Sequence, residues 1–102
     1  MPPCYIVGDV HVTDPERYPD YAKHTESTLE PFGGRFIVRG GETDVLEGGW
    51  APGRIVVIEF PDEASARGWY ESDAYRAILP IRQEASDGSL LLVGGYERGA
   101  TV

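Results

Sequence analysis

Four segments of the chain carry hydrophobic patterns that are typical of β-strands. The first alternates hydrophobic and polar side chains towards its end, so Val10 falls on one face while Asp9 and His11 fall on the other. The third and fourth segments are apolar at nearly every position, which predicts strands that are covered on both faces. The predicted strands are residues 5–12, 35–39, 54–60 and 89–95.

Hydrophobic residues at helical spacing predict a long helix between the first two strands. Residues 13–16 give a helix-start signal, and Pro19 is expected to open the main helix after a short turn, because proline fits the first turn of a helix. Pro31 and Gly33-Gly34 are expected to end it. The apolar stripe of this helix consists of Tyr18, Tyr21, Ala22, Thr25, Leu29 and Phe32.

Two further helical segments follow the third strand. Residues 63–71 are expected to form one helix. Ser72-Asp73 is an N-cap signal for a second helix, which runs towards Ala85 with a bend or a restart at Pro80.

Glycines mark the connections between the strands. Gly40-Gly41 follows Arg39 and predicts a β-bulge, because glycine accepts backbone angles that other residues avoid. The pattern leaves room for the strand to resume at residues 43–46, before a turn-rich hairpin loop at residues 47–53. Asp87-Gly88 is expected to turn the chain into the last strand.

The order of these elements is βαββαβ, with the second crossover in two helical pieces. It predicts an α+β protein with a ferredoxin-like plait, a four-stranded antiparallel sheet with helices on one face. Residues 1–96 are expected to form this single domain, and 97–102 a polar C-terminal tail. Because two strands are apolar on both faces, the face without helices would expose a hydrophobic patch. We therefore expect a homodimer in which two such sheets close a dimeric α/β barrel.

The composition limits the partners of the protein. The 102 residues include 17 acidic and 9 basic ones, and the formal charge of −8 argues against non-specific binding to nucleic acid or to anionic lipid. The longest apolar runs are too short to cross a bilayer, and the N-terminus has no signal-peptide pattern, so we expect a cytoplasmic protein. Cys4 is alone, which excludes an internal disulfide.

Three charged residues are candidates for chemistry on the face without helices. The alternation places Asp9 and Glu59 there on two neighbouring strands, so we expect them to lie close together. It places Arg39 on the same face of the edge strand. Two carboxylates in a partly buried space raise each other's pKa unless a cation lies between them. Arg39 therefore has two interpretations: it pairs with Glu59 and fixes the strand register, or it binds a carboxylate or enolate oxygen of a ligand.

The histidines add a candidate base. His24 lies beside the apolar stripe of the first helix, where it is a candidate general base together with Asp9 or Glu59, or a partly exposed boundary residue. The spacing of His11, His24 and these carboxylates matches no metal-ligand motif. No phosphate-binding glycine motif, G-x-S-x-G or HExxH occurs, so we expect neither a metal nor a cofactor.

Four aromatic residues are candidates for binding a substrate. Trp69, Tyr70 and Tyr75 either line the mouth of a cavity or belong to the core. Trp50, in its glycine-rich loop, either covers a pocket or packs on the partner subunit.

Several short motifs, in order along residues 3 to 96, resemble one mainly bacterial family, the domain-of-unknown-function family 1330. Those motifs are Tyr5 to Val10, Thr13-Asp14-Pro15, Gly33 to Gly41, Glu59 to Asp62, Trp69 to Ser72, Tyr75 and Ile81-Arg82. The resemblance implies the ferredoxin-like, dimeric α/β-barrel superfamily. Its other members include cofactor-independent monooxygenases, dehydratases, muconolactone isomerases and haem-degrading enzymes, whose sites commonly lie between sheet and helices.

The family itself has no established reaction, so the resemblance implies architecture more strongly than function. The chain departs from the family pattern at Asp73, where a proline is expected, and in its tail after Gly95. The signature positions that the resemblance marks as candidates are Arg39, Glu59, Tyr70 and Tyr75.

These observations favour a homodimer with a small pocket in each subunit that binds a modest organic molecule. In its enzymatic form, Arg39 would hold a carboxylate or enolate oxygen while His24, Asp9 or Glu59 moves a proton, as in a cofactor-independent oxygenase or isomerase. The alternative is a non-catalytic, ligand-binding or stress-associated dimer whose polar interior residues serve folding alone.

Overall fold

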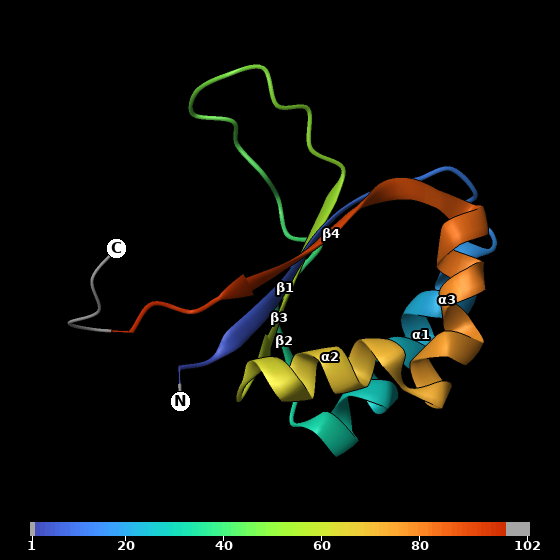
Figure 1. Ribbon diagram of the computed structural model, residues 1–102. Helices are drawn as coiled ribbons and strands as arrows, with labels where there is room; N and C mark the ends of the chain where they lie inside the picture. The colour runs from blue at the N-terminus through green and yellow to red at the C-terminus, as the bar shows by residue number, and fades with distance from the viewer. Residues whose placement is uncertain (1, 98–102) are drawn as a thin grey trace.

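The computed structural model describes residues 2–97 (Figure 1), so the predicted tail lies, from residue 98 on, outside the described residues. Its elements confirm the predicted βαββαβ order. They are β1 (Cys4–Val12), α1 (Tyr18–Leu29), the 3-10 helix η1 (Glu30–Phe32), β2 (Arg35–Arg39), β3 (Arg54–Phe60), α2 (Glu63–Glu71), α3 (Asp73–Ala85) and β4 (Ser86–Gly94). Among these residues no helix combines the length and the hydrophobicity that crossing a membrane requires.

The four strands form one antiparallel sheet in the order β2-β3-β1-β4. All three α-helices lie on one side of it, and the loop between β2 and β3 extends away from the sheet on the other side (Figure 1). This is the ferredoxin-like plait, and the predicted α+β fold is confirmed.

The core lies between the helices and one face of the sheet. Trp69 is its centre: its ring centroid lies 5.6 Å from that of Phe60 and 4.1 Å from that of Tyr75, and all three side chains are almost fully buried. The alternation along β1 and β3 confirms which side chains face the helices, because Ile6, Val10 and Ile58 are buried while their neighbours along the strand are not. Each such side chain contributes about 1.5–3 kcal/mol when it is fully buried.

Side chains cap the starts of α2 and α3, of which the sequence predicted the cap of α3, while α1 has no side-chain cap. The Asp14 carboxylate accepts hydrogen bonds from the backbone N–H groups of the next turn, and α1 then begins with Pro19 in its first turn. Asp62 caps α2 by accepting from the Ser65 N–H at 2.7 Å. Ser72 caps α3. These caps satisfy backbone donors that a helix start leaves without partners.

The predicted bulge at Gly40-Gly41 is wrong in its position, because the irregularity lies at Ile37. Phe36 pairs with Ile58 and the next pair is Val38 with Val57, so Ile37 is the extra residue of β2. A side chain that follows a bulge changes face. This shift places Arg39 on the helix-facing side of the sheet rather than on the side that the alternation predicted.

Glycine acts differently at the end of β2. Gly40 adopts a left-handed φ of 69°, and a Cβ there would collide with the Arg54 guanidinium. Its N–H donates to the Ile55 carbonyl at 2.7 Å, which closes the base of the loop over residues 40–53. The strand does not resume at residues 43–46, which lie in this loop.

The predicted turn at Asp87-Gly88 is also wrong. β4 begins at Ser86, directly after α3, and Gly88 already pairs with Val10. Gly88 allows the two strands to approach because a Cβ at this position would collide with the backbone carbonyl of Asp9. The helix before it runs through Pro80 as one element, without a restart.

The close approach at Gly88 gives a stability prediction. Gly88→Ala should lower the free energy of unfolding by about 1–3 kcal/mol, because the strands must separate to admit the methyl group. Gly94→Ala is the matched control in the same strand, where a Cβ meets no atom within 4 Å. Urea unfolding at constant m-value measures both. Equal effects of the two substitutions would show that the β1–β4 contact at Gly88 is not tight.

Candidate functional site

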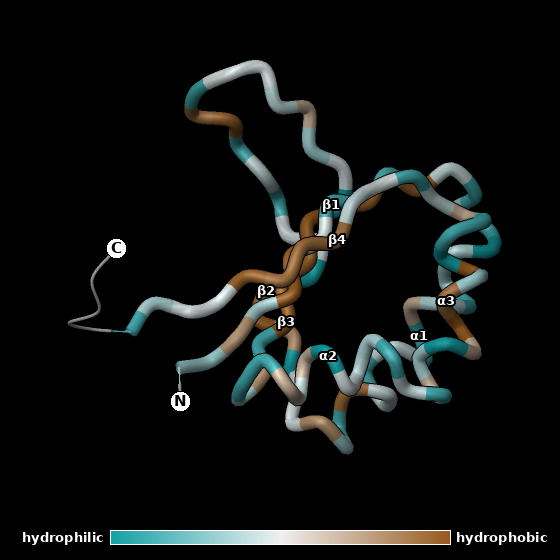
Figure 2. Tube along the Cα trace, viewed as in Figure 1, coloured by the Kyte–Doolittle hydropathy of each residue, from teal (hydrophilic) through white to brown (hydrophobic). Residues whose placement is uncertain are grey.

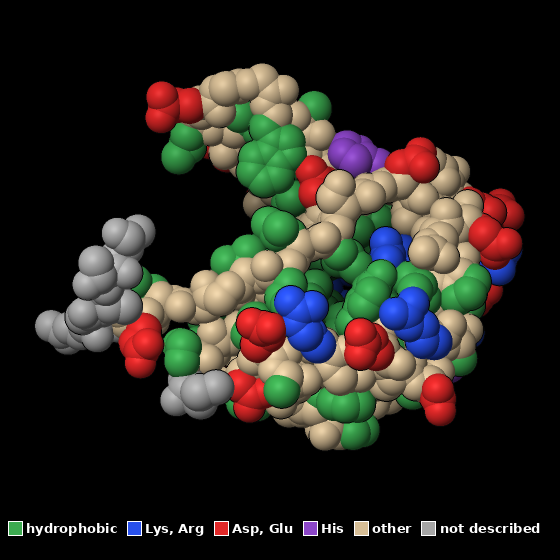
Figure 3. All heavy atoms as spheres, in the orientation of Figure 1, with side chains coloured by type: hydrophobic (Ala, Val, Ile, Leu, Met, Phe, Trp, Pro, Cys, Tyr) green, Lys and Arg blue, Asp and Glu red, His purple; other side chains and the backbone are tan. Residues whose placement is uncertain are grey.

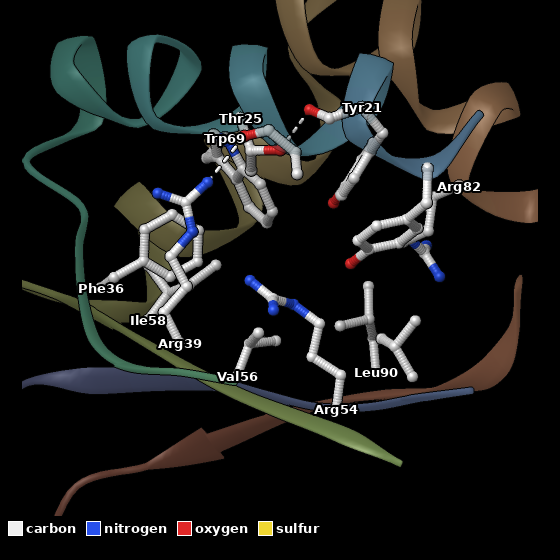
Figure 4. Close-up of a pocket in the computed structure, with 13 residues that line it drawn as sticks. Tyr21, Thr25, Phe36, Arg39, Arg54, Val56, Ile58, Trp69, Arg82 and Leu90 are labelled. Atoms are coloured by element: carbon white, nitrogen blue, oxygen red, sulfur yellow. Dashed lines mark hydrogen bonds between the residues drawn. The ribbon is translucent and has the colours of Figure 1, made fainter. Parts of the chain in front are cut away.

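Three arginines line one pocket between α1 and the sheet (Figure 4). Arg39 comes from β2, Arg54 from β3 and Arg82 from α3. We call this site the arginine pocket. Its cavity volume is about 20 Å³, and the space in front of it is continuous with the solvent. Its other lining residues are Val10, Tyr18, Tyr21, Ala22, Thr25, Phe36, Val56, Ile58, Trp69 and Leu90.

The protein holds Arg39 in place from two sides. Its guanidinium lies over the Phe36 ring, 4.3 Å from the centroid, and donates to the Ala22 carbonyl of α1 at 2.6 Å. Glu26, an exposed residue of α1, lies 3.9 Å away. The stacking and the backbone contact fix the plane of the guanidinium at the pocket wall.

Arg54 is the least satisfied of the three. Its Nε is buried and has no hydrogen-bond partner among the described residues. The guanidinium lies 6.0 Å from the centroid of the Tyr18 ring, and Gly40 leaves the space that it occupies. Because buried polar groups in proteins almost always have a partner, this donor indicates a position for a ligand oxygen or a water.

Arg82 is linked to two buried tyrosines. Its Nε donates to the Tyr75 hydroxyl at 3.3 Å, and the Tyr75 and Tyr21 hydroxyl oxygens are 2.9 Å apart. Burial, with the neighbouring Tyr75, raises the pKa of Tyr21 far above its usual value. Burial disfavours the charge of Arg82, yet its contacts with Tyr75 and Tyr21 hold the pKa of the guanidinium above its usual value. The Arg82 cation therefore lies in one hydrogen-bonded chain with a neutral Tyr21 hydroxyl.

The pocket is positive within an acidic protein. It gathers three of the nine basic residues of a chain with a formal charge of −8, and none of its lining residues is acidic. Of the ion pairs that the described residues form, none involves Arg54 or Arg82, and Arg39 has only the distant Glu26. Cations in a concave site with apolar walls focus a field that attracts anions.

The aromatic candidates divide between the pocket and its surroundings. Trp69 lines the pocket while its indole N–H donates to the Thr28 hydroxyl at 2.9 Å. Tyr75 is fully buried behind the pocket wall. Tyr70 lies elsewhere, in a second hollow between α2 and β4. Trp50 is 62% exposed in the loop on the opposite side of the sheet.

The prediction that Asp9 and Glu59 lie close together is wrong. The register places Asp9 opposite Ile55 but Glu59 opposite Tyr5, which is four residues before Asp9 in β1. Both carboxylates do face away from the helices, as predicted, and each has its own partners. Those partners are the Trp50 indole N–H and the Gly53 N–H for Asp9, both at 2.8 Å, and Arg35 at 2.7 Å and the Tyr5 hydroxyl at 3.3 Å for Glu59.

The predicted ion pair between Arg39 and Glu59 is also wrong, because the bulge at Ile37 turns Arg39 towards α1 and leaves Glu59 to Arg35. On Asp9, hydrogen bonds from Trp50 and then from the Gly53 backbone lower the pKa of the carboxyl.

The histidines do not line the arginine pocket. His24 is exposed on α1, and His11 lies beside Asp9 on the other face of the sheet, with its Nε2 3.6 Å from a carboxylate oxygen. Within residues 2–97 no group of three or more histidine, cysteine, aspartate or glutamate side chains is placed to hold a metal ion.

Sequence reasoning missed Arg54 and Arg82 as site residues. For Arg54 a signal exists: the alternation that places Val56 and Ile58 towards the helices also places Arg54 there, and a charged residue on a core-facing position needs a partner. Arg82 lies seven residues after Tyr75 and four after Ile78 on one helix. This spacing places its side chain on the same helix face as those two residues.

Solved structures share the fold of the chain at low sequence identity. A protein of unknown function from Rhodopseudomonas palustris superposes with a TM-score of 0.76 at 20% identity, over 94% of this chain and 84% of the other. SnoaB, a cofactor-independent oxygenase from Streptomyces nogalater, gives 0.70 at 13% identity, over 99% and 100%. HapK from Hahella chejuensis gives 0.59 at 14%, over 97% and 96%.

Comparison with curated proteins finds no significant match. The family model that matches is described as a domain of unknown function, DUF1330, and the match covers residues 3–96, almost the whole chain. The fold, the motifs and this match agree, and the chain belongs to the DUF1330 family.

Proposed function

We propose that the arginine pocket binds a small organic anion through a carboxylate or enolate oxygen. The observation that carries the proposal is the buried Arg54 Nε, a charged donor with no partner among the described residues, in a pocket whose lining residues include no carboxylate. Arg54 is half-buried, and burial of its Nε without a partner costs free energy that an anionic ligand would reduce. The planar guanidinium suits the two oxygens of a carboxylate.

The walls of the pocket complement such a ligand. Val56, Ile58 and Leu90 supply an apolar floor from the sheet, and Phe36 and Trp69 supply aromatic sides. A few polar groups in an otherwise apolar cavity are the usual arrangement of a small-molecule site. A ligand of this kind would place its anionic end in the small cavity, and its flat or aliphatic body would extend through the opening.

Binding without acid–base turnover is the function that the geometry supports best. The ionisable groups that line the pocket are arginines and tyrosines, while His24, Asp9 and Glu59 lie outside it. A catalytic role of these three residues stays a prediction. The fold that the chain shares with SnoaB keeps a cofactor-independent oxygenase as the second candidate, in which the same arginines would stabilise an enolate.

We also propose that a second copy of the chain covers the face of the sheet that carries no helices. Hydrophobic residues run along all four strands (Figure 2), and such side chains are also visible in the hollow between the protruding loop and the sheet (Figure 3). A face of this extent on a small domain is typical of an interface. Its most exposed large side chains are Leu91 at 58%, Ile37 at 47%, Val38 at 39% and Val93 at 38%.

Arg54→Gln tests the binding function. It should abolish the thermal shift that carboxylates such as benzoate or phenylacetate cause in the wild type, because the pocket loses this cation. A ligand at a hundred times its dissociation constant stabilises the protein by about 2.7 kcal/mol. The ligand-free variant should be at least as stable as the wild type, since an unpaired charge is removed. Arg76→Gln, outside the pocket, is the control. A large loss of ligand-free stability with an intact carboxylate response would show that Arg54 is structural.

Leu91→Glu tests the second copy. A charge on this exposed position should weaken dimerisation by about tenfold or more, because the interface would bury it without a partner. Sedimentation velocity over a concentration series measures the change. Ala74→Glu, an exposed position on α3, should leave association unchanged. A wild-type protein that sediments as an 11.2 kDa monomer at all concentrations contradicts the proposal.

A further inference from the structure

We propose that Tyr21 donates a hydrogen bond to the anionic oxygen of the ligand, and that the chain Arg82–Tyr75–Tyr21 directs its hydroxyl proton into the arginine pocket. The inference rests on the proposed function, since it assigns a binding residue to the same site. It follows from the direction that each hydrogen bond of the chain must take.

The direction of the hydrogen bond between Arg82 and Tyr75 follows from the chemistry of arginine. A guanidinium N–H donates and cannot accept. The bond of 3.3 Å between the Arg82 Nε and the Tyr75 hydroxyl therefore makes the Tyr75 oxygen the acceptor.

The direction of the hydrogen bond between Tyr75 and Tyr21 follows from the burial of Tyr75. This side chain is 0% exposed, and among residues 2–97 its hydroxyl has two partners, Arg82 and Tyr21. Tyr75 has one proton to donate, and Tyr21, with its oxygen 2.9 Å away, is the available acceptor. In the reverse arrangement Tyr21 donates to Tyr75, and the Tyr75 proton is left buried without an acceptor, which is unfavourable.

The Tyr21 hydroxyl has its own proton free to point into the arginine pocket. Tyr21 accepts from Tyr75, so its own proton must point elsewhere, and no other described group forms a hydrogen bond with this hydroxyl. Tyr21 lines the pocket while Tyr75 does not. Burial raises the pKa of Tyr21, so the hydroxyl keeps its proton at neutral pH and remains a donor. The charge of Arg82 polarises the chain and strengthens this donor.

The chain also narrows the class of the ligand. The side chains of Tyr21, from α1, and Arg54, from the sheet, extend from opposite walls towards the same space (Figure 4). Both groups present donors there, so the atom between them must be an acceptor without a proton. Carboxylate, enolate and carbonyl oxygens all meet this requirement, and the charge of Arg54 favours the anionic ones, whereas an amide nitrogen or an ammonium group presents a donor against donors.

The experiment compares the wild type with Tyr21→Phe, Tyr75→Phe and the exposed control Tyr96→Phe. The probes are benzoate, phenylacetate, cinnamate and hexanoate, measured by titration calorimetry. Loss of a hydrogen bond to a charged oxygen should weaken the best of these probes about tenfold or more in Tyr21→Phe. Tyr75→Phe should weaken the binding of this probe less, because Tyr21 keeps its hydroxyl and loses only the hydrogen bond that orients the hydroxyl proton. Tyr96→Phe should bind as the wild type does.

A spectroscopic measurement keeps the proposal falsifiable if a variant does not fold. In wild-type protein with 13Cζ-labelled tyrosine, the probe should shift the Tyr21 resonance, with a smaller change at Tyr75. A structural role of Tyr21 alone would leave this resonance unchanged on binding.

The outcomes separate the inference from the proposed function. Equal affinity of the wild type and Tyr21→Phe, or a larger loss in Tyr75→Phe than in Tyr21→Phe, overturns the inference and leaves the anion-binding pocket intact. If none of the four carboxylates binds the wild type, the proposed function fails and the inference fails with it.

Discussion

A positive charge held beneath a helix without a carboxylate beside it is the constraint on which the pocket depends. Arg54 extends from the sheet into the space under α1, and its buried Nε has no partner among the described residues. Such an arrangement persists only where the surrounding structure is stable enough to bear it. The aromatic core around Trp69, which joins the sheet to α3 through Tyr75, supplies that stability next to the pocket.

Arg39 and Arg82 have hydrogen-bond partners within the protein, and these partners are of different kinds. Arg39 lies on Phe36 and donates to a helix carbonyl, so its plane is set before any ligand arrives. Arg82 is joined to hydroxyls, so its charge acts through Tyr75. Preorganised donors of this kind reduce the entropy that a ligand loses on binding and favour flat anions over flexible ones.

The sequence predicted the fold well and the site only in part, for reasons that particular residues show. Strands and helix starts follow from local patterns, as the alternation along β1 and the cap at Ser72 show. The bulge at Ile37 has no such signal, because it depends on how β2 pairs with β3, and that pairing moved Arg39 to the other face. The separation of the carboxylates likewise depends on the register of β1 and β3, which alternation alone does not give.

The loop over residues 40–53 has a consequence for how this family can vary. Arg39 and Arg54 are the residues that flank this loop. The hydrogen bond from the Gly40 N–H to the Ile55 carbonyl joins its two ends. Lengthening or shortening such a loop changes the closure entropy only slowly with the number of residues. Insertions and deletions in its outer part should therefore leave Arg39 and Arg54 in the arginine pocket. A shift of one residue in the pairing of β2 with β3 would instead move their side chains out of the pocket.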